Sequence, residues 1–204
     1  MTSRTPLPGA PVAALAYFIW GLFPLYWSLL APVPVLQVLA HRALWCAVVV
    51  WAYLIVVGQA RWWRSLSPRL FWTLTASGLL ISVNWGVYIL GVNTGHVLDT
   101  SLGYFITPFV NVVVGLTLLR ERLNAWQVAA VVLAAAGVLY LTLSLGRPPW
   151  IALLLAFSFG AYGLLRKLAV VDAVHGLAFE STIMAVPALG WLGWLAWRGE
   201  GAFL

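Results

Sequence analysis

The chain has 204 residues, of which 63% are hydrophobic and 8% are charged, whereas an average soluble domain is about 45–50% apolar and about 25% charged. This composition excludes a soluble globular domain. The net charge of +6 comes from 11 basic and 5 acidic residues, but the basic residues stand singly or in pairs between apolar runs, unlike the basic surface of a nucleic-acid-binding protein. The single cysteine, Cys46, excludes an intrachain disulfide and a cysteine-rich metal site.

Seven apolar runs that could each cross a bilayer follow one another along the chain. They cover Pro11 to Leu30, Val35 to Val57, Leu70 to Gly91, Leu98 to Leu119, Ala125 to Leu145, Trp150 to Leu165 and Leu177 to Trp197. A spanning helix needs about 20 residues, so only the sixth run is short. Because a helix satisfies its own backbone groups in hydrocarbon, we expect an all-α integral membrane protein with seven transmembrane helices.

The distribution of basic residues predicts the orientation in the membrane. With the N-terminus in the cytoplasm, Arg147 and Arg198 lie outside, Arg42 lies within a helix, and the other basic residues lie inside. Those inside are Arg4, Arg61, Arg64, Arg69, Arg120, Arg122, Arg166 and Lys167. Cytoplasmic loops carry the excess of Lys and Arg, so we expect a cytoplasmic N-terminus.

A weak internal repeat relates the first apolar run to the sixth. A shift of 139 residues places Trp20 on Phe159 and His41 on Glu180. The same shift aligns Gly21 and Pro24 with Gly160 and Gly163. We interpret these four residues as helix breaks, which mark the binding sites of inverted-repeat transporters.

The repeat predicts how the chain is divided. Its period covers five helices, and an odd number places a duplicated unit upside down in the membrane. We expect residues 9–145 to form a first five-helix repeat and residues 148–198 an incomplete second repeat of two helices. A complete pair would have ten helices, so either three helices are absent or seven suffice, and we expect a truncated chain.

Polar side chains within the apolar runs are the best guide to function, because hydrocarbon tolerates them only beside a partner or a cavity. The fourth run carries such residues every three or four positions, which places them on one helical stripe. They are Thr100, Tyr104, Thr107, Asn111 and Gly115. We expect this stripe to face inward and the apolar residues between, such as Leu102 and Ile106, to face outward. A solute pathway and interhelical hydrogen bonds are both compatible with the stripe.

The second and third runs add further candidates for a binding site. Arg42 could anchor an anionic group, neutralise an acid or extend to the outer headgroups. His41 precedes it, and Tyr88 shares a helix face with Asn84. The expected substrate-binding set is His41, Arg42, Asn84, Tyr88, Tyr104, Thr107 and Asn111.

Three titratable residues could carry a coupling proton: Asp99, Glu180 and His41. Asp99 could equally cap the fourth helix, and Glu180 could turn toward the inner interface. No nucleotide loop, His-Glu-x-x-His or Gly-x-Ser-x-Gly motif occurs in the sequence. We therefore expect no enzyme, no catalytic residue, no cofactor and no metal.

Four stretches of the sequence resemble one known family. They are "AYFIWGLFPLYW" at 16–27, "AHRALW" at 40–45, "NWGVYILGVNTGHVLDTSLGYFITPFVNVVVGLTLLRERL" at 84–123 and "LAFSFGAYGLLRK" at 155–167. They closely resemble the RarD-type, chloramphenicol-sensitivity branch of the EamA drug/metabolite transporter superfamily. The family usually has Glu at the position of Asp99, Asn at that of Thr107 and Gly at that of Arg120.

The resemblance implies a ten-helix transporter of two inverted repeats in the bacterial inner membrane, with members associated with chloramphenicol sensitivity or resistance. We expect a truncated small-solute transporter that works by alternating access. The alternative is a non-transporting membrane scaffold or remnant. The expected partners are a small solute and the lipid bilayer, without nucleic acid, and either a second copy of the chain or a missing C-terminal half would complete it.

Overall fold

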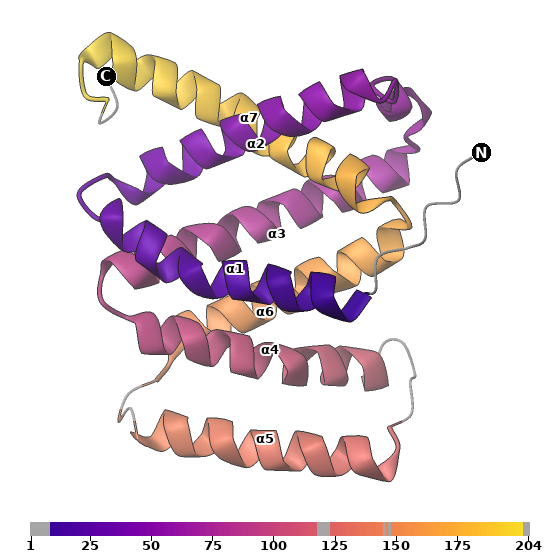
Figure 1. Ribbon diagram of the computed structural model, residues 1–204, viewed down its shortest axis with the longest axis vertical. Helices are drawn as coiled ribbons and strands as arrows, with labels where there is room; N and C mark the ends of the chain where they lie inside the picture. The colour runs from indigo at the N-terminus through magenta and orange to yellow at the C-terminus, as the bar shows by residue number, and fades with distance from the viewer. Residues whose placement is uncertain (1–8, 118–122, 145, 147, 202–204) are drawn as a thin grey trace.

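Seven long helices form the described part of the chain (Figure 1). The computed structural model describes residues 9–117, 123–144, 146 and 148–201. The helices in these ranges are α1 (Gly9–Leu29), α2 (Val35–Val56), α3 (Pro68–Asn93), α4 (Val97–Thr117), α5 (Ala125–Ser144), α6 (Trp150–Ala169) and α7 (Ala173–Arg198), with a 3-10 turn η1 (Trp62–Ser65) before α3. Each of the seven is long and apolar enough to cross a membrane. The expected all-α membrane fold is confirmed.

Several helix boundaries differ from the expected ones, most clearly in α6 and α7. Helix α7 begins at Ala173 instead of Leu177, because the Asp172 carboxylate accepts a hydrogen bond from the Val174 N–H at 2.9 Å. Helix α6 continues to Ala169, so at 20 residues it is not short. The expected ends at Leu119 and Leu145 lie outside the described residues.

Helix α6 is packed between α3 and α4, and α7 crosses α2 and α3, whereas α5 lies beside α4 (Figure 1). Two glycines allow the close contact of α4 with α6. A Cβ at Gly103 would lie 2.9 Å from the Leu155 Cβ, and one at Gly160 would lie 2.5 Å from Val110 Cγ1. These glycines therefore let the backbones approach each other.

The apolar side of α4 was expected to face outward, and this prediction is wrong for Leu102 and Ile106. Both are buried, at 3% and 9% exposure, against Ala152 and Ala156 of α6. The physical reason is that α4 has two protein-facing sides. Its polar stripe lies on one side, toward α3. Helix α6 covers Leu102 and Ile106 on another side.

The expected helix breaks do not occur. Helix α1 runs without interruption through Gly21 and Pro24, and α6 runs through Gly160 and Gly163. Apolar surroundings tolerate Gly and Pro within spanning helices when the remaining backbone hydrogen bonds persist. The alignment of these residues therefore does not mark discontinuous helices.

The two ends of the bundle carry different numbers of basic residues. The connections from α2 to α3 and from α6 to α7 lie at the same end as the start of α1 (Figure 1). That end carries Arg61, Arg64, Arg69, Arg166 and Lys167, and Arg198 lies at the opposite end. Arg4, Arg120, Arg122 and Arg147, which also enter the charge count, lie outside the described residues.

Candidate functional cavity

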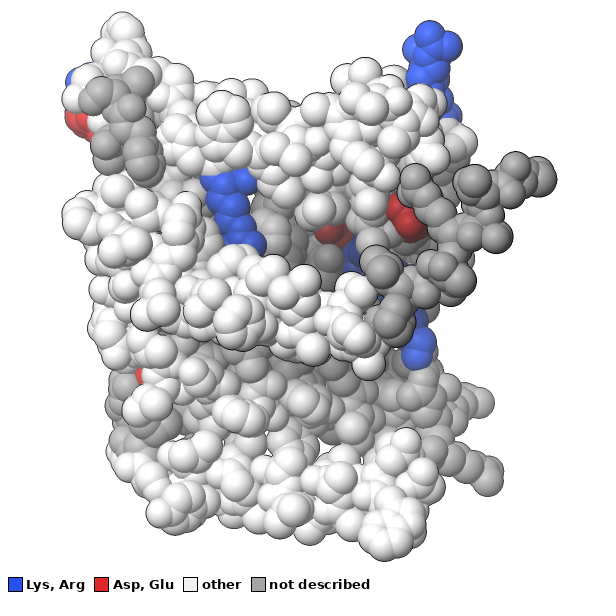
Figure 2. All heavy atoms as spheres, in the orientation of Figure 1, with Lys and Arg blue, Asp and Glu red and all other residues white. Residues whose placement is uncertain are grey.

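A cavity of about 500 Å³ lies among α1, α2, α3, α4 and α6. Half of its lining is aromatic: Tyr17, Trp20, Phe23, Trp27, Trp85, Tyr88, Tyr104 and Phe159. Its polar side chains are Arg42, Asn84, Ser101, Thr107 and Asn111, and Gly21, Pro24 and Pro108 complete it. Figure 2 shows the surface hollowed between α1 and α2, with a basic side chain in the hollow. Among the described residues, the lining contains one cationic group and no carboxylate.

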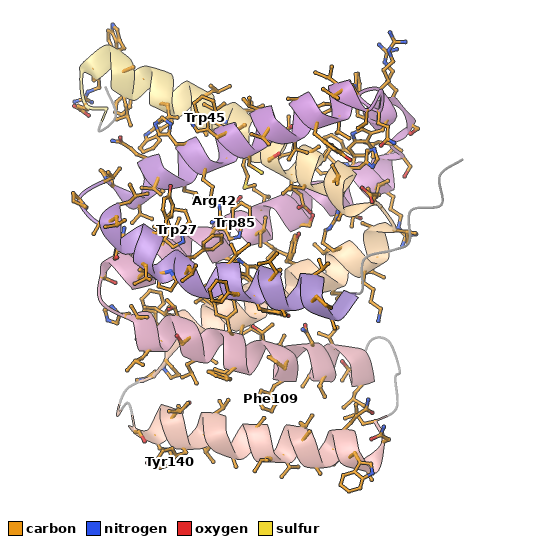
Figure 3. The ribbon with its side chains drawn as sticks, in the orientation of Figure 1. Trp27, Arg42, Trp45, Trp85, Phe109 and Tyr140 are labelled. Atoms are coloured by element: carbon orange, nitrogen blue, oxygen red, sulfur yellow. The ribbon has the colours of Figure 1, made fainter. Side chains whose placement is uncertain are left out.

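Arg42 is held by aromatic rings. Its guanidinium carbon lies 3.7 Å from the centre of the Trp85 ring and 5.4 Å from that of Trp27 (Figure 3). Among the described residues it forms no ion pair and no hydrogen bond. A contact with a ring face uses none of the five guanidinium N–H donors. Arg42 is therefore a positioned cation whose donors are available to a ligand.

The stripe on α4 supplies the opposite wall of the cavity. Tyr104 contacts Tyr88 edge to face, with ring centres 5.8 Å apart. The Thr107 hydroxyl donates to the Gly103 carbonyl at 2.9 Å, so its donor is already used. The Asn111 amide has no hydrogen-bond partner within the described ranges. The donors and the acceptor of the Asn111 amide are therefore all available for hydrogen bonds to a solute.

Thr100, at the start of the same stripe, has a packing role instead. It is 1% exposed, and its methyl group occupies the space in which a Cβ of Gly91 would lie. The stripe is therefore partly helix packing and partly cavity wall, as both interpretations of the sequence allowed.

Asn84 also lines the cavity, but its amide group holds α3 against α6. It is 2% exposed, and its Nδ2 donates to the Leu155 carbonyl at 2.9 Å and to the Ser158 hydroxyl at 3.0 Å. An amide NH₂ has two hydrogens, so both donors are used between the helices. Only its carbonyl oxygen is left for a ligand.

Of the expected binding residues, all except His41 line the cavity. His41 and Arg42 are neighbours on a helix with 3.6 residues per turn, so their side chains point in different directions. Asp99 lies in the first turn of α4 at 3% exposure and is not part of the lining. Gly160 and Gly163 also lie outside it, whereas Gly21 and Pro24 form part of its wall.

Glu180 lies in a separate polar cluster. It is 1% exposed, so it does not turn toward a membrane interface. Ser77 of α3 donates to its Oε1 at 2.5 Å, and Tyr162 of α6 donates to its Oε2 at 3.4 Å. The Arg166 Nη1 lies 3.7 Å from Oε1. Three helices thus surround one buried carboxylate.

Sequence reasoning missed the aromatic partners of Arg42. Trp85 stands next to Asn84 in the sequence, and Trp27 lies in the first apolar run. A cation within an apolar run requires stabilising neighbours, and this requirement could have drawn attention to the tryptophans. Their distances could not be foreseen, because they depend on how α1, α2 and α3 pack.

A second groove, of about 390 Å³, lies among α2, α3 and α7. Its lining is apolar apart from Ser82, so it offers little that could orient a polar solute. In the described part of the chain no three His, Cys, Asp or Glu side chains are grouped to hold a metal ion. The cavity around Arg42 is therefore the candidate site.

Helices of spanning length around a partly polar cavity are features of a multi-pass membrane protein. The EamA-like transporter family matches residues 7–143, and the chain belongs to this family, in its RarD-type branch.

Three relatives illustrate the similarity. The chain is 45% identical to the uncharacterized transporter PA0485 of Pseudomonas aeruginosa, over 90% of this chain and 62% of the relative. It is 44% identical to protein RarD of Streptomyces exfoliatus, over 92% of this chain and 60% of the relative. It is 42% identical to the uncharacterized transporter YojE of Bacillus subtilis, over 90% of this chain and 63% of the relative. The chain thus spans about 60% of their length. No solved structure matches it significantly.

Proposed function

We propose that the chain moves small organic solutes with an anionic or zwitterionic group across the bacterial inner membrane by alternating access. The cavity around Arg42 would hold the solute, and rocking of the two repeat units would open it to either side. Membership of a transporter family supports the class of function. It also argues against an enzymatic activity.

The observation that carries the proposal is the unpartnered guanidinium of Arg42 in a cavity without a carboxylate. A buried or half-buried cation is costly unless charge or hydrogen bonds compensate it. An anionic solute group would supply this compensation. The aromatic walls would contact an apolar body, and Asn111 would contribute directional hydrogen bonds.

The repeat remains part of the proposal, with residues 9–145 as the first unit and 148–198 as part of a second. Trp20 and Phe159, which the shift of 139 residues aligns, pack with ring centres 6.4 Å apart and both line the cavity. Such a pairing is what two related units around one site would produce. The excess of Arg and Lys at one end of the bundle supports a cytoplasmic N-terminus.

Flux into proteoliposomes tests the transport proposal. The probes are benzenesulfonate, which stays anionic, and phenyltrimethylammonium, which is a cation of similar size. Chloramphenicol is the third probe, because members of the RarD-type branch are associated with chloramphenicol sensitivity or resistance. We expect the chain to move the sulfonate in preference to the cation, and Arg42→Ala to reduce that flux about tenfold to hundredfold, as loss of a charged hydrogen bond would. Asn111→Ala should reduce it less.

Arg198→Ala is the matched control, because Arg198 also lies over a tryptophan but at the end of α7, outside the cavity. Sulfonate flux that is unchanged in Arg42→Ala and Asn111→Ala would reject the proposed site. Because the chain spans about 60% of its relatives, the assay is repeated with co-expression of the remaining part of the Streptomyces exfoliatus relative. Flux only on co-expression would indicate a split transporter, and no flux in either case would favour a scaffold.

A further inference from the structure

The cluster around Glu180 lies apart from the cavity but is connected to it. Phe159 lines the cavity, and its ring centre is 5.9 Å from that of Tyr162, whose hydroxyl donates to Glu180. The cluster lies toward the end of the bundle where α3 and α7 begin and α6 ends. The Glu180 cluster therefore lies between the cavity and this end of the bundle.

The groups facing Glu180 include one cation. Helix α6 contributes Arg166 and Tyr162, α3 contributes Ser77, and α2 contributes Cys46. On α7 itself, His175 and the capping Asp172 lie at the first turn and pair with each other at 3.3 Å. In the described part of the chain, the other donors that reach the carboxylate are the neutral hydroxyls of Ser77 and Tyr162. The charge of Glu180 is therefore balanced mainly by Arg166.

The contact between Arg166 and Glu180 is incomplete. Its 3.7 Å separation is within the range of an ion pair but too long for a hydrogen bond. The Arg166 Nη1 is buried and has no hydrogen-bond partner in the described residues. Its Nη2 donates to the Asp172 backbone carbonyl at 3.5 Å. The guanidinium thus lies between two acceptors and is fully bound to neither.

The fold leaves space for the guanidinium to lie there. A Cβ on Gly176 would overlap three atoms of the Arg166 guanidinium. Gly176 is one turn before Glu180 on α7, so the absence of a side chain places the cation against the same helix face. A change in the Arg166 side-chain conformation would move the guanidinium toward the carboxylate or toward the Asp172 carbonyl.

We infer that Glu180 is a proton-binding site, and that the distance to Arg166 decides whether it holds the proton. This inference rests on the proposed transport function, since it provides the step that couples solute movement to protons. When Arg166 approaches, the carboxylate is charged and the pair is neutral. When Arg166 withdraws, Glu180 takes one proton from water, becomes a neutral acid, and leaves one net positive charge on the cluster. Return of Arg166 releases that proton.

The physical basis is a balance of two opposing effects. Removal of water favours the neutral form of a carboxylic acid, and a nearby cation favours its charged form. Both effects are large in an apolar interior, and the attraction of the cation weakens as the distance to Arg166 increases. A movement of about 1 Å in the Arg166 position can therefore change the protonation of Glu180 at constant pH.

Infrared difference spectroscopy of the full chain in lipid nanodiscs, titrated between about pH 4 and about pH 9, tests the inference without a solute. Among the described residues, Glu180 and Asp99 are the buried carboxylates, so the spectra are recorded in an Asp99→Asn background, in which the carbonyl band of a protonated buried carboxyl is assigned to Glu180. We expect this band in the wild type, its loss in Glu180→Gln and its retention in Glu200→Gln, where the glutamate is exposed. Removal of the cation in Arg166→Gln should move its midpoint upward by about 1–3 pH units.

Gly176→Ala provides a second variant that keeps every charge. The added methyl group displaces the guanidinium, so the midpoint should shift from its wild-type value although no charge is removed. A band that persists in Glu180→Gln overturns the inference, and so does a midpoint that is the same in wild type, Arg166→Gln and Gly176→Ala.

A second readout separates this inference from the transport proposal. Benzenesulfonate flux is measured with and without a pH gradient. If none of the probes is transported while the carbonyl band changes with pH as expected, the proton site stands and the transport proposal fails. If flux occurs and its dependence on the gradient is unchanged in Glu180→Gln, the inference is overturned and transport stands. Flux that loses its gradient dependence in Glu180→Gln supports both.

Discussion

The guanidinium carbon of Arg42 lies 3.7 Å from the ring centre of Trp85, although the two residues belong to different helices, α2 and α3. The Trp85 ring fixes the position and orientation of the Arg42 guanidinium, which faces the cavity. Binding in the cavity therefore depends on a residue that needs no contact with the solute's charged group. This relationship leads to the first prediction.

Replacement of Trp85 by leucine should weaken anion binding while leaving the charge of Arg42 in place. A cation over an aromatic ring is stabilised by about 0.5–2 kcal/mol, so we expect an about 2- to 30-fold higher half-saturation concentration for benzenesulfonate flux. Trp72→Leu on the same helix is the control, because Trp72 is 68% exposed and lies outside the cavity. Equal half-saturation in the two variants would contradict the role of Trp85.

The two cavity asparagines should separate stability from binding. Asn84→Leu removes two donors that join α3 to α6, and we expect it to lower the free energy of unfolding by about 1–2 kcal/mol. Asn111→Leu breaks no hydrogen bond among the described residues, so it should leave stability within about 0.5 kcal/mol and reduce flux. Denaturant titration of purified protein in mixed micelles measures the difference, and a reversed order of stabilities would argue against this division.

A third prediction concerns the contact of α4 with α6. A Cβ on Gly103 would meet the backbone of Ala152, with its carbonyl oxygen at 3.1 Å, so Gly103→Ala forces the helices apart and should cost about 1–3 kcal/mol. Gly163→Ala is the matched control, since nothing lies within 4 Å of a Cβ there, and alanine favours a helix over glycine. Thermal unfolding should show a clear loss for the first variant and none for the second.

The connection before α7 should give an acid-dependent stability. The backbone N–H of Val174 donates to the Asp172 carboxylate and lowers the pKa of Asp172 below its usual range. Because the folded-state pKa is below the unfolded one, this stabilisation is complete above the unfolded pKa, about 4, and is lost as the pH falls through the folded pKa.

Asp172→Asn retains a capping side chain but does not titrate. The stability difference between wild type and Asp172→Asn should therefore decrease as the pH is lowered below about 4. Thermal unfolding at a series of pH values measures it, with Glu200→Gln expected to follow the wild type. A difference that stays constant across this range would show that the charge of Asp172 does not contribute.

The helices could be predicted from the sequence because hydrophobic length is a local property. All seven apolar runs became helices, with ends set by local caps such as Ser67, whose side chain accepts from the Leu70 N–H at 3.2 Å. The spacing on α4 also indicated that Tyr104, Thr107 and Asn111 share a wall.

The rest depended on contacts between helices that are distant in sequence. The position of α6 between α3 and α4 buried Leu102 and used both donors of Asn84. Ser77 and Glu180 are 103 residues apart, and neither has a local pattern that predicts their hydrogen bond. For the same reason, the sequence could offer Glu180 only as one of three titratable candidates.

Helix α5 has no buried residue and lies at the edge of the bundle beside α4 (Figure 1). Tyr140 is 71% exposed on it and lies away from Trp27, Arg42 and Trp85 of the cavity (Figure 3). The chain contains a single cysteine, Cys46. A spin label on a cysteine introduced at Tyr140 of a cysteine-free background would therefore record movement of this outer helix while leaving the cavity wall chemically intact.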